Sequence, residues 1–154
     1  MVSFDEVATA VAQHAFLRDF STDRLDQLAQ RANLRDFQPA HLIFKQGDPA
    51  GSFYLIVCGA VSLTHAGLKG NTAIQTLTRG DALGWSWLFP PYDWHFNAMA
   101  IEPTRLIEFD AERLRQLCHE HPDFGYEFMS LITKVVIDRL QNTRQKLLKS
   151  LGGL

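Results

Sequence analysis

The residues best suited to bind a ligand lie close together, between Gly80 and Ala98. This stretch holds all three tryptophans of the chain, two prolines and a histidine, and it opens with the sequence GDALG. A glycine turn that leads into a short helix aims free backbone N–H groups at an anion, here those of Ser86 and Trp87. The indole rings beside it can either stack on a flat ligand or fill the space themselves. The stretch therefore predicts either an anion-binding pocket or a pocket filled by its own side chains.

The other polar residues lack the spacing of a catalytic or metal centre. The remaining histidines fall singly or, for the last two, close together in a loop: His14, His41, His65, His119 and His121. The carboxylates that could do acid–base work are spread over turns and strand faces: Asp48, Asp81, Glu102 and Glu108. Cys58 and Cys118 have no CxxC spacing. We therefore expect no metal, no cofactor and no enzymatic activity, with both cysteines buried as small apolar residues.

Composition limits the classes of partner. The 154 residues carry a formal net charge of -2, with 46% hydrophobic and 21% charged residues. A nucleic-acid-binding domain would show a basic face, so we expect no direct contact with DNA or RNA. The N-terminal sequence MVSFDEVATAVAQHAFLRDF lacks a basic leader, and no run approaches the roughly 18 apolar residues of a membrane span. These features predict a cytoplasmic protein.

Hydrophobic periodicity divides the chain into three parts. Residues 1–33 have helical spacing, as in TDRLDQLAQRANL, with Ser21 and Thr22 as candidate N-caps. Residues 34–109 form short runs rich in β-branched and aromatic residues that are cut by glycines, which is typical of an antiparallel β unit. Residues 110–154 turn helical again, with Asp110 as a cap and Pro122 opening a long helix. The three parts together predict one structural domain of the α+β class, mainly β.

The long final helix carries a stripe in alternating steps of four and three residues, the spacing of a coiled-coil seam. Such a stripe either lies on the β unit or pairs with a second copy of the chain. Polar residues flank the stripe, so we expect a homodimer. The predicted interface residues are Met129, Ile132, Thr133, Val136, Leu140, Thr143 and Leu147.

Two segments share a pattern of glycines and apolar residues with a known family of domains. In LIFKQGDPAGSFYLIVCGAVSLT the matching positions are Gly47, Asp48, Tyr54, Leu55, Ile56 and Gly59. In LTRGDALG they are Gly80, Asp81, Leu83 and Gly84. On these residues the chain resembles the cyclic-nucleotide-binding domain of the Crp/Fnr superfamily, in which the second segment is similar to the turn into the phosphate-binding cassette, and the resemblance covers about residues 14–148. The resemblance implies a jelly-roll-like antiparallel β-roll, flanked by N-terminal helices and a long C-terminal dimerisation helix. It also implies a regulatory, non-enzymatic role.

The segment from Gly80 to Ala98, hereafter the cassette, departs from that family at its two main contacts. In the family's nucleotide binders, a glutamate after the second glycine holds the ribose, and a later arginine pairs with the cyclic phosphate. Here Trp85 stands at the glutamate position, and either His95 or Trp94 stands at the arginine position, depending on the direction of counting. An imidazole cannot replace the two parallel bonds and permanent charge of a guanidinium. We therefore expect no tight binding of cAMP or cGMP.

The sequence leaves two functions open. The first is a sensory module whose altered cassette binds a flat, apolar or aromatic ligand, and it is favoured because polar residues interleave the indoles. The second is a module whose tryptophans fill the pocket and which acts through protein partners, like a Crp/Fnr regulator without its helix-turn-helix DNA-binding domain. Since the chain ends at SLGGL, we expect a stand-alone or shortened form. The predicted ligand-binding residues are Gly80, Asp81, Leu83, Gly84, Trp85, Ser86, Trp87, Trp94, His95, Asn97 and Ala98.

Overall fold

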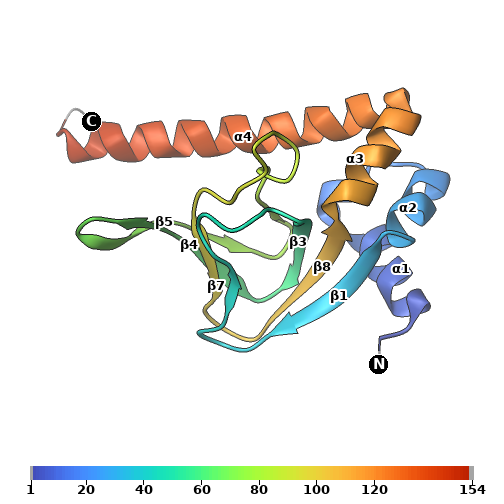
Figure 1. Cartoon of the computed structure of the whole chain (residues 1–154), viewed down its shortest axis with the longest axis horizontal. Coiled ribbons are helices and arrows are strands. Elements are labelled where there is room, and N and C mark those ends of the chain that lie inside the picture. The colour runs from blue at the N-terminus through green and yellow to red at the C-terminus, as the bar shows by residue number, and fades with distance from the viewer. Residues whose placement is uncertain (1, 153–154) are drawn as a thin grey trace. The chain divides into compact units, whose positions relative to one another are not determined.

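The computed structural model describes residues 2–152. Its elements run as helices, then strands, then helices, in the predicted order (Figure 1). The contacts divide the chain into two compact units, Met1–Gln116 and Leu117–Leu154. The helical elements are α1 (Phe4–Gln13), a 3-10 turn η1 (Ala15–Leu17), α2 (Thr22–Ala29), α3 (Ala111–Glu120) and α4 (Pro122–Ser150). The strands are β1 (Ala32–Phe37), β2 (Leu42–Phe44), β3 (Ser52–Cys58), β4 (Ala60–Gly67), β5 (Gly70–Thr78), β6 (Ala82–Leu83), β7 (Asn97–Ala100) and β8 (Thr104–Asp110).

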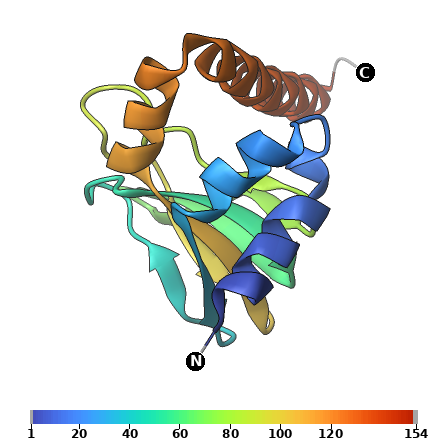
Figure 2. The same ribbon diagram turned by 90° about the vertical axis from the view of Figure 1, so that its right-hand side faces the viewer.

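Capping residues set the starts of the N-terminal helices. Ser3 and Glu6 form a capping box at the start of α1. The Ser21 hydroxyl accepts the Arg24 N–H at 3.3 Å, so Ser21 is the N-cap of α2, one of the two caps that the sequence predicts. The two helices lie side by side, and α1 also contacts β1 and β8 (Figure 2). Strand β1 begins at Ala32, slightly before the predicted boundary at residue 34.

The strands form two four-stranded antiparallel sheets, in the orders β1-β8-β3-β6 and β2-β7-β4-β5. Side chains from both sheets make a common core, and the largest fully buried ones include Leu55, Leu63, Leu83 and Leu106. Gly59, between β3 and β4, has a φ of +98°, and a side chain there would meet Thr104. The predicted α+β fold with an antiparallel β-roll and flanking helices is confirmed.

The C-terminal helices begin at the predicted residues. The Asp110 carboxylate accepts the Arg113 N–H at 2.9 Å and caps α3, and Pro122 is the first residue of α4. After α4 the chain turns at Gly152, whose φ is +73°. Gly153, the next residue, lies outside the described residues. Within residues 2–152, no helix has the length and apolar composition needed to cross a membrane.

Burial separates α4 into two faces. Phe124, Phe128 and Ile132 recur every four residues and are at most 2% exposed. The prediction that Ile132 belongs to an exposed dimer seam is therefore wrong, because the step from Met129 to Ile132 moves around the helix onto the buried face. On the opposite face Leu140 is 66% and Leu147 is 57% exposed. Two residues that the sequence analysis omitted, Tyr126 and Ile137, are also exposed there.

The cysteine prediction is also corrected. Cys58 is exposed because it lies at the end of β3, where the register with β8 shifts and the strand leaves the core. Cys118 is half-buried, and burial raises the pKa of its thiol to about 11. The Cys118 thiol therefore stays protonated at neutral pH.

Candidate functional site

The opening of the cassette is fixed by backbone hydrogen bonds. The Gly80 N–H donates to the Ile56 carbonyl at 3.1 Å, and the Ile56 N–H donates to the Asp81 carbonyl at 3.0 Å. Asp81 Oδ2 accepts the Thr78 N–H at 2.9 Å, which closes the turn after β5. Gly80 has a φ of +90°, a conformation that favours glycine. The predicted glycine turn is therefore present, and the Asp81 carboxylate serves to hold it.

The predicted short helix after Gly84 does not form. The segment makes a single turn in which the Leu88 N–H donates to the Trp85 carbonyl at 3.0 Å. Pro90 has no N–H to continue a helical ladder, and it disfavours helical geometry at the residue before it. The Ser86 and Trp87 N–H groups therefore do not form the start of an anion-binding helix, and that expectation is wrong.

Trp94 occupies the space in front of the second cassette glycine. Its ring stacks on Phe44, with centroids 3.7 Å apart and planes 7° from parallel, and only 4% of the residue is exposed. The Tyr54 ring lies on the same cluster, 6.4 Å from Trp94. A β-carbon placed on Gly84 would lie 2.5 Å from Cζ3 of Trp94. The indole therefore packs directly against the cassette backbone.

Trp87 is also part of the core and is fastened from α3. It is fully buried, with its ring 5.2 Å from that of Phe53. The Arg115 guanidinium donates to the Trp87 carbonyl and lies 4.3 Å from the centroid of the Tyr92 ring. The Arg115 side chain thus contacts the cassette at both Trp87 and Tyr92.

The other predicted ligand residues divide into buried and outward-facing groups. Leu83, Gly84, Ser86 and Ala98 are buried, whereas Trp85 is half-buried with its ring edge-on to Phe96, 6.4 Å away. His95 is exposed. The Asn97 side chain accepts the Gln46 N–H at 2.7 Å, so it fastens the cassette to the segment after β2.

A polar network links strands β1, β3 and β8. Glu108 accepts hydrogen bonds from Arg35 and Ser52, both at 3.1 Å. Burial and the neighbouring Glu108 carboxylate raise the pKa of Tyr54 to about 12. Tyr54 is therefore neutral at physiological pH and serves as a packing residue.

Sequence reasoning missed two residues of this site. The first is Phe44, because nothing in its local sequence pattern pairs it with Trp94. Arg115 lies in AERLRQLC, where its position suggests an ordinary solvated helix face. A detectable signal existed in Gly84, since a glycine before a bulky aromatic segment often marks a close approach. Across the described residues, no group of three or more His, Cys, Asp or Glu side chains could hold a metal ion.

Comparison with known proteins places this geometry in a family. The cyclic nucleotide-binding domain family matches residues 34–121. The chain belongs to that family. Its curated relatives include the transcriptional activator protein anr of Pseudomonas aeruginosa, 29% identical over 122 residues, covering 77% of this chain and 48% of the relative. They also include a CRP-like cAMP-activated global transcriptional regulator of Mycobacterium tuberculosis, 24% identical, covering 73% of this chain and 49% of that protein. The resemblance to Crp/Fnr regulators is confirmed.

The matches cover most of this chain but only part of each curated relative. The chain spans about half the length of these two regulators. It also matches glutaminase 1 of Bradyrhizobium diazoefficiens, 29% identical over 141 residues but only 22% of that protein. Among solved structures, a putative cyclic nucleotide-binding protein from Geobacter metallireducens matches with a TM-score of 0.77 at 23% identity, covering 91% of this chain and 99% of that one. This likeness supports the fold.

Proposed function

We propose that this chain is a non-enzymatic regulatory domain in which Trp94, rather than a cyclic nucleotide, fills the cassette. The observation that carries the proposal is the contact between the Trp94 ring and Gly84. A ligand lying against that glycine would have to displace an indole that is stacked on Phe44 and 4% exposed. The buried area of a tryptophan, on the order of 150–250 Å², makes this displacement costly.

Charge supports the same proposal. The cassette contains no arginine or lysine in its sequence, and its histidine, His95, is exposed. The nearby cation on α3, Arg115, donates to the Trp87 carbonyl and faces the Tyr92 ring. A cyclic phosphate in the usual place would therefore lack the bidentate, charge-assisted partner that such a group needs.

Calorimetric titration with cAMP and cGMP tests the filled cassette. We expect no saturable heat below millimolar nucleotide with the unaltered chain. A micromolar dissociation constant would overturn the proposal. Trp94→Gly is the matched variant, because it removes the indole while leaving the remaining cassette sequence intact. We expect added indole to stabilise this variant and to leave the parent unchanged, since engineered apolar cavities bind small apolar rings.

A second candidate is the binding of a flat ligand on the outside of the cassette. It is favoured by Trp85, which is half-buried, and by the neighbouring Phe89, which is 47% exposed. Native mass spectrometry of the purified chain distinguishes the two candidates, because a retained small molecule adds its mass. Loss of that mass in Trp85→Ala would favour the outer site over the filled cassette.

Self-association through α4 is the second part of the proposal. The exposed apolar face of α4 runs along one side of the helix, opposite Phe124 and Phe128, and its strongly exposed members are Tyr126, Leu140 and Leu147. A continuous apolar face on a 29-residue helix has the form of a coiled-coil surface. We expect a homodimer through Met129, Thr133, Val136, Leu140, Thr143 and Leu147, with Tyr126 and Ile137 added from the structure.

A further inference from the structure

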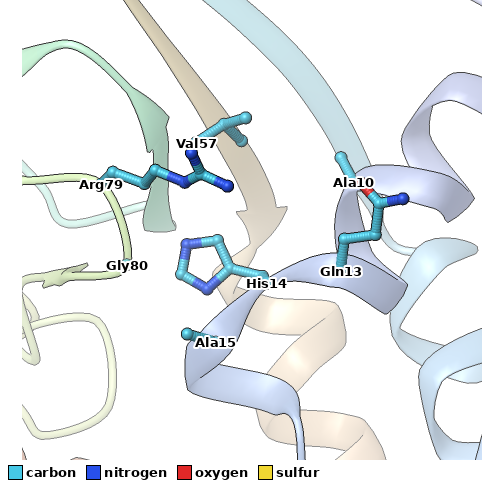
Figure 3. A pocket seen from close by; sticks show the side chains of 7 residues that line it. All are labelled: Ala10, Gln13, His14, Ala15, Val57, Arg79 and Gly80. Atoms are coloured by element: carbon cyan, nitrogen blue, oxygen red, sulfur yellow. The ribbon is translucent and has the colours of Figure 1, made fainter.

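A cavity lies next to the first cassette glycine, Gly80, between the N-terminal helices and the strands. Its volume is about 290 Å³. Apolar walls come from Ala10, Ala15 and Val57, and polar groups come from Gln13, His14 and Arg79 (Figure 3). Gly80 completes the lining. Apart from this glycine, the cavity shares no residue with the predicted ligand site in the cassette.

His14 is held in one protonation state by its partners. Its Nε2 lies 2.8 Å from the Ile56 carbonyl oxygen, and its Nδ1 lies 3.2 Å from the Phe16 nitrogen. Since a carbonyl only accepts and a backbone N–H only donates, Nε2 carries the proton and Nδ1 is unprotonated. The residue is 6% exposed, and burial lowers the pKa of the imidazole below its ordinary value. The buried ring is therefore neutral and donates no hydrogen bond into the cavity.

The Arg79 guanidinium supplies the positive charge of the cavity. Figure 3 shows it beside the His14 ring, with Gln13 across from them. The described lining residues include no acidic side chain. The Asp81 carboxylate, which accepts the Thr78 N–H, acts on His14 and favours its charged form. A guanidinium beside apolar walls fits a ligand with one anionic end and one apolar end.

We propose that this cavity binds a small organic carboxylate. Its carboxylate pairs with the Arg79 guanidinium, whose planar fork matches two carboxylate oxygens. Its apolar body lies against Ala10, Ala15 and Val57, and Gln13 offers an amide to further polar groups. The volume of about 290 Å³ is just below the roughly 300–1,000 Å³ range of ligand pockets, so the ligand is small. The proposal is independent of whether Trp94 fills the cassette.

The site is connected to the cassette through one carbonyl. The Ile56 oxygen accepts both the His14 Nε2–H and the Gly80 N–H, at 2.8 and 3.1 Å. A carboxylate beside Arg79 offsets the positive charge that disfavours a charged His14, so ligand binding raises the pKa of His14. Protonation at Nδ1 would remove the acceptor of the Phe16 N–H at the start of η1. Ligand binding thus acts on both the N-terminal helices and the first cassette residue.

The test uses NMR titration of the whole chain with sodium butyrate. We expect saturable shifts of the His14 ring Cε1–H and of the Val57 and Gly80 amides, together with a higher titration midpoint for His14. Arg79→Gln should weaken binding about tenfold or more, which is the effect of losing a charge-assisted hydrogen bond. Arg18→Gln is the matched control, because it removes the same charge from an exposed residue beside η1 and should leave the affinity unchanged.

Two further probes define the chemical class. Butyramide has the same size without the charge, and inorganic phosphate has the charge without the apolar body, so both should bind more weakly than butyrate. Equal binding by butyramide, tighter binding by phosphate, or an unchanged affinity in Arg79→Gln would overturn the proposal. The absence of any saturable shift at His14, Val57 or Gly80 in the unaltered chain would also overturn it.

Discussion

The Trp94 ring lies where the side chain of residue 84 would begin. A β-carbon on Gly84 would be 2.5 Å from Cζ3 of Trp94 and 3.2 Å from Cη2. The glycine also has a φ of +87°, in the left-handed region that other residues rarely adopt. Position 84 therefore requires glycine for two separate reasons, its backbone conformation and its contact with the indole.

Substitution of Gly84 by alanine should destabilise the chain more than the same change at Gly47. Both residues have nearly the same positive φ, +87° and +91°. In both variants the left-handed conformation of the new alanine should lower the free energy of unfolding by about 1–2 kcal/mol. Nothing lies within 4 Å of a β-carbon at Gly47, whereas at Gly84 the Trp94 ring must move. We expect an additional loss of about 1–3 kcal/mol for Gly84→Ala, measured by urea unfolding.

A double variant identifies the source of that difference. The double variant Gly84→Ala/Trp94→Leu should lose less stability than the sum of the losses in the two single variants, because the alanine then meets a smaller side chain. Strictly additive losses would show that the Trp94 contact is not what makes Gly84→Ala costly.

The turns and the element order could be predicted from local sequence, because glycines and capping side chains act on their immediate neighbours. Gly80 needs its positive φ for the turn after β5, and Asp110 caps the helix that follows it. The stacking of Trp94 on Phe44 could not be predicted, because it depends on β2 and the end of the cassette meeting in space. Arg115 was missed for the same reason, since its partners lie outside its own helix.

The choice between an open and a filled cassette could not be made from residue types. The polar residues of the cassette favoured an open site, but two of them form hydrogen bonds with the protein itself. The Asp81 carboxylate accepts the Thr78 N–H, and the Asn97 side chain accepts the Gln46 N–H. Such bonds depend on the tertiary arrangement, which periodicity does not contain.

Trp94→Ala should lose much more stability than Trp85→Ala. Trp94 is stacked and 4% exposed, so truncation leaves a cavity and should cost about 3–5 kcal/mol. Trp85 is half-buried, and we expect a loss of about 1–2 kcal/mol. Urea unfolding gives both values, and acrylamide quenching of tryptophan emission gives an independent check. We expect most of the quenchable emission to disappear in Trp85→Ala. Equal losses of stability would contradict the filled cassette.

The buried His14 should make the folded state less stable in mild acid. Its pKa is lowered on folding, so the unfolded chain takes up a proton near pH 6.5 while the folded chain does so at a lower pH. The contribution of neutral His14 to the free energy of unfolding is therefore fully present above about pH 6.5 and is lost as the pH falls below that value. The pKa of Asp36 is lowered by its hydrogen bonds from Arg105, so Asp36 changes the pH dependence of stability only below about pH 4, outside the range in which His14 does.

Unfolding measurements between about pH 5 and 8 check this, with His14→Gln as the variant. Glutamine keeps a donor for the Ile56 carbonyl but does not titrate, so the stability of His14→Gln should change less with pH than that of the parent. His41→Gln is the control, because His41 is exposed and its replacement should preserve the parent's pH dependence. If His14→Gln follows the same curve as the parent, the buried neutral histidine is not the source.

The exposed face of α4 should hold two copies of the chain together. Leu140 is 66% exposed and lies on the same face as Met129 and Thr133, so a charged side chain there would enter a dimer seam. We expect the unaltered chain to sediment as a dimer and Val136→Glu/Leu140→Glu to sediment as a monomer with the circular dichroism of the β strands retained. Lys146→Glu is the matched control, because it changes the net charge by the same two units at an exposed position outside the predicted seam, and it should remain dimeric. Since Ile132 is buried on the opposite face, Ile132→Ala should lower stability by about 2–5 kcal/mol without shifting the association constant of the folded chain. Sedimentation of the parent as a monomer at all concentrations would contradict the proposed dimer.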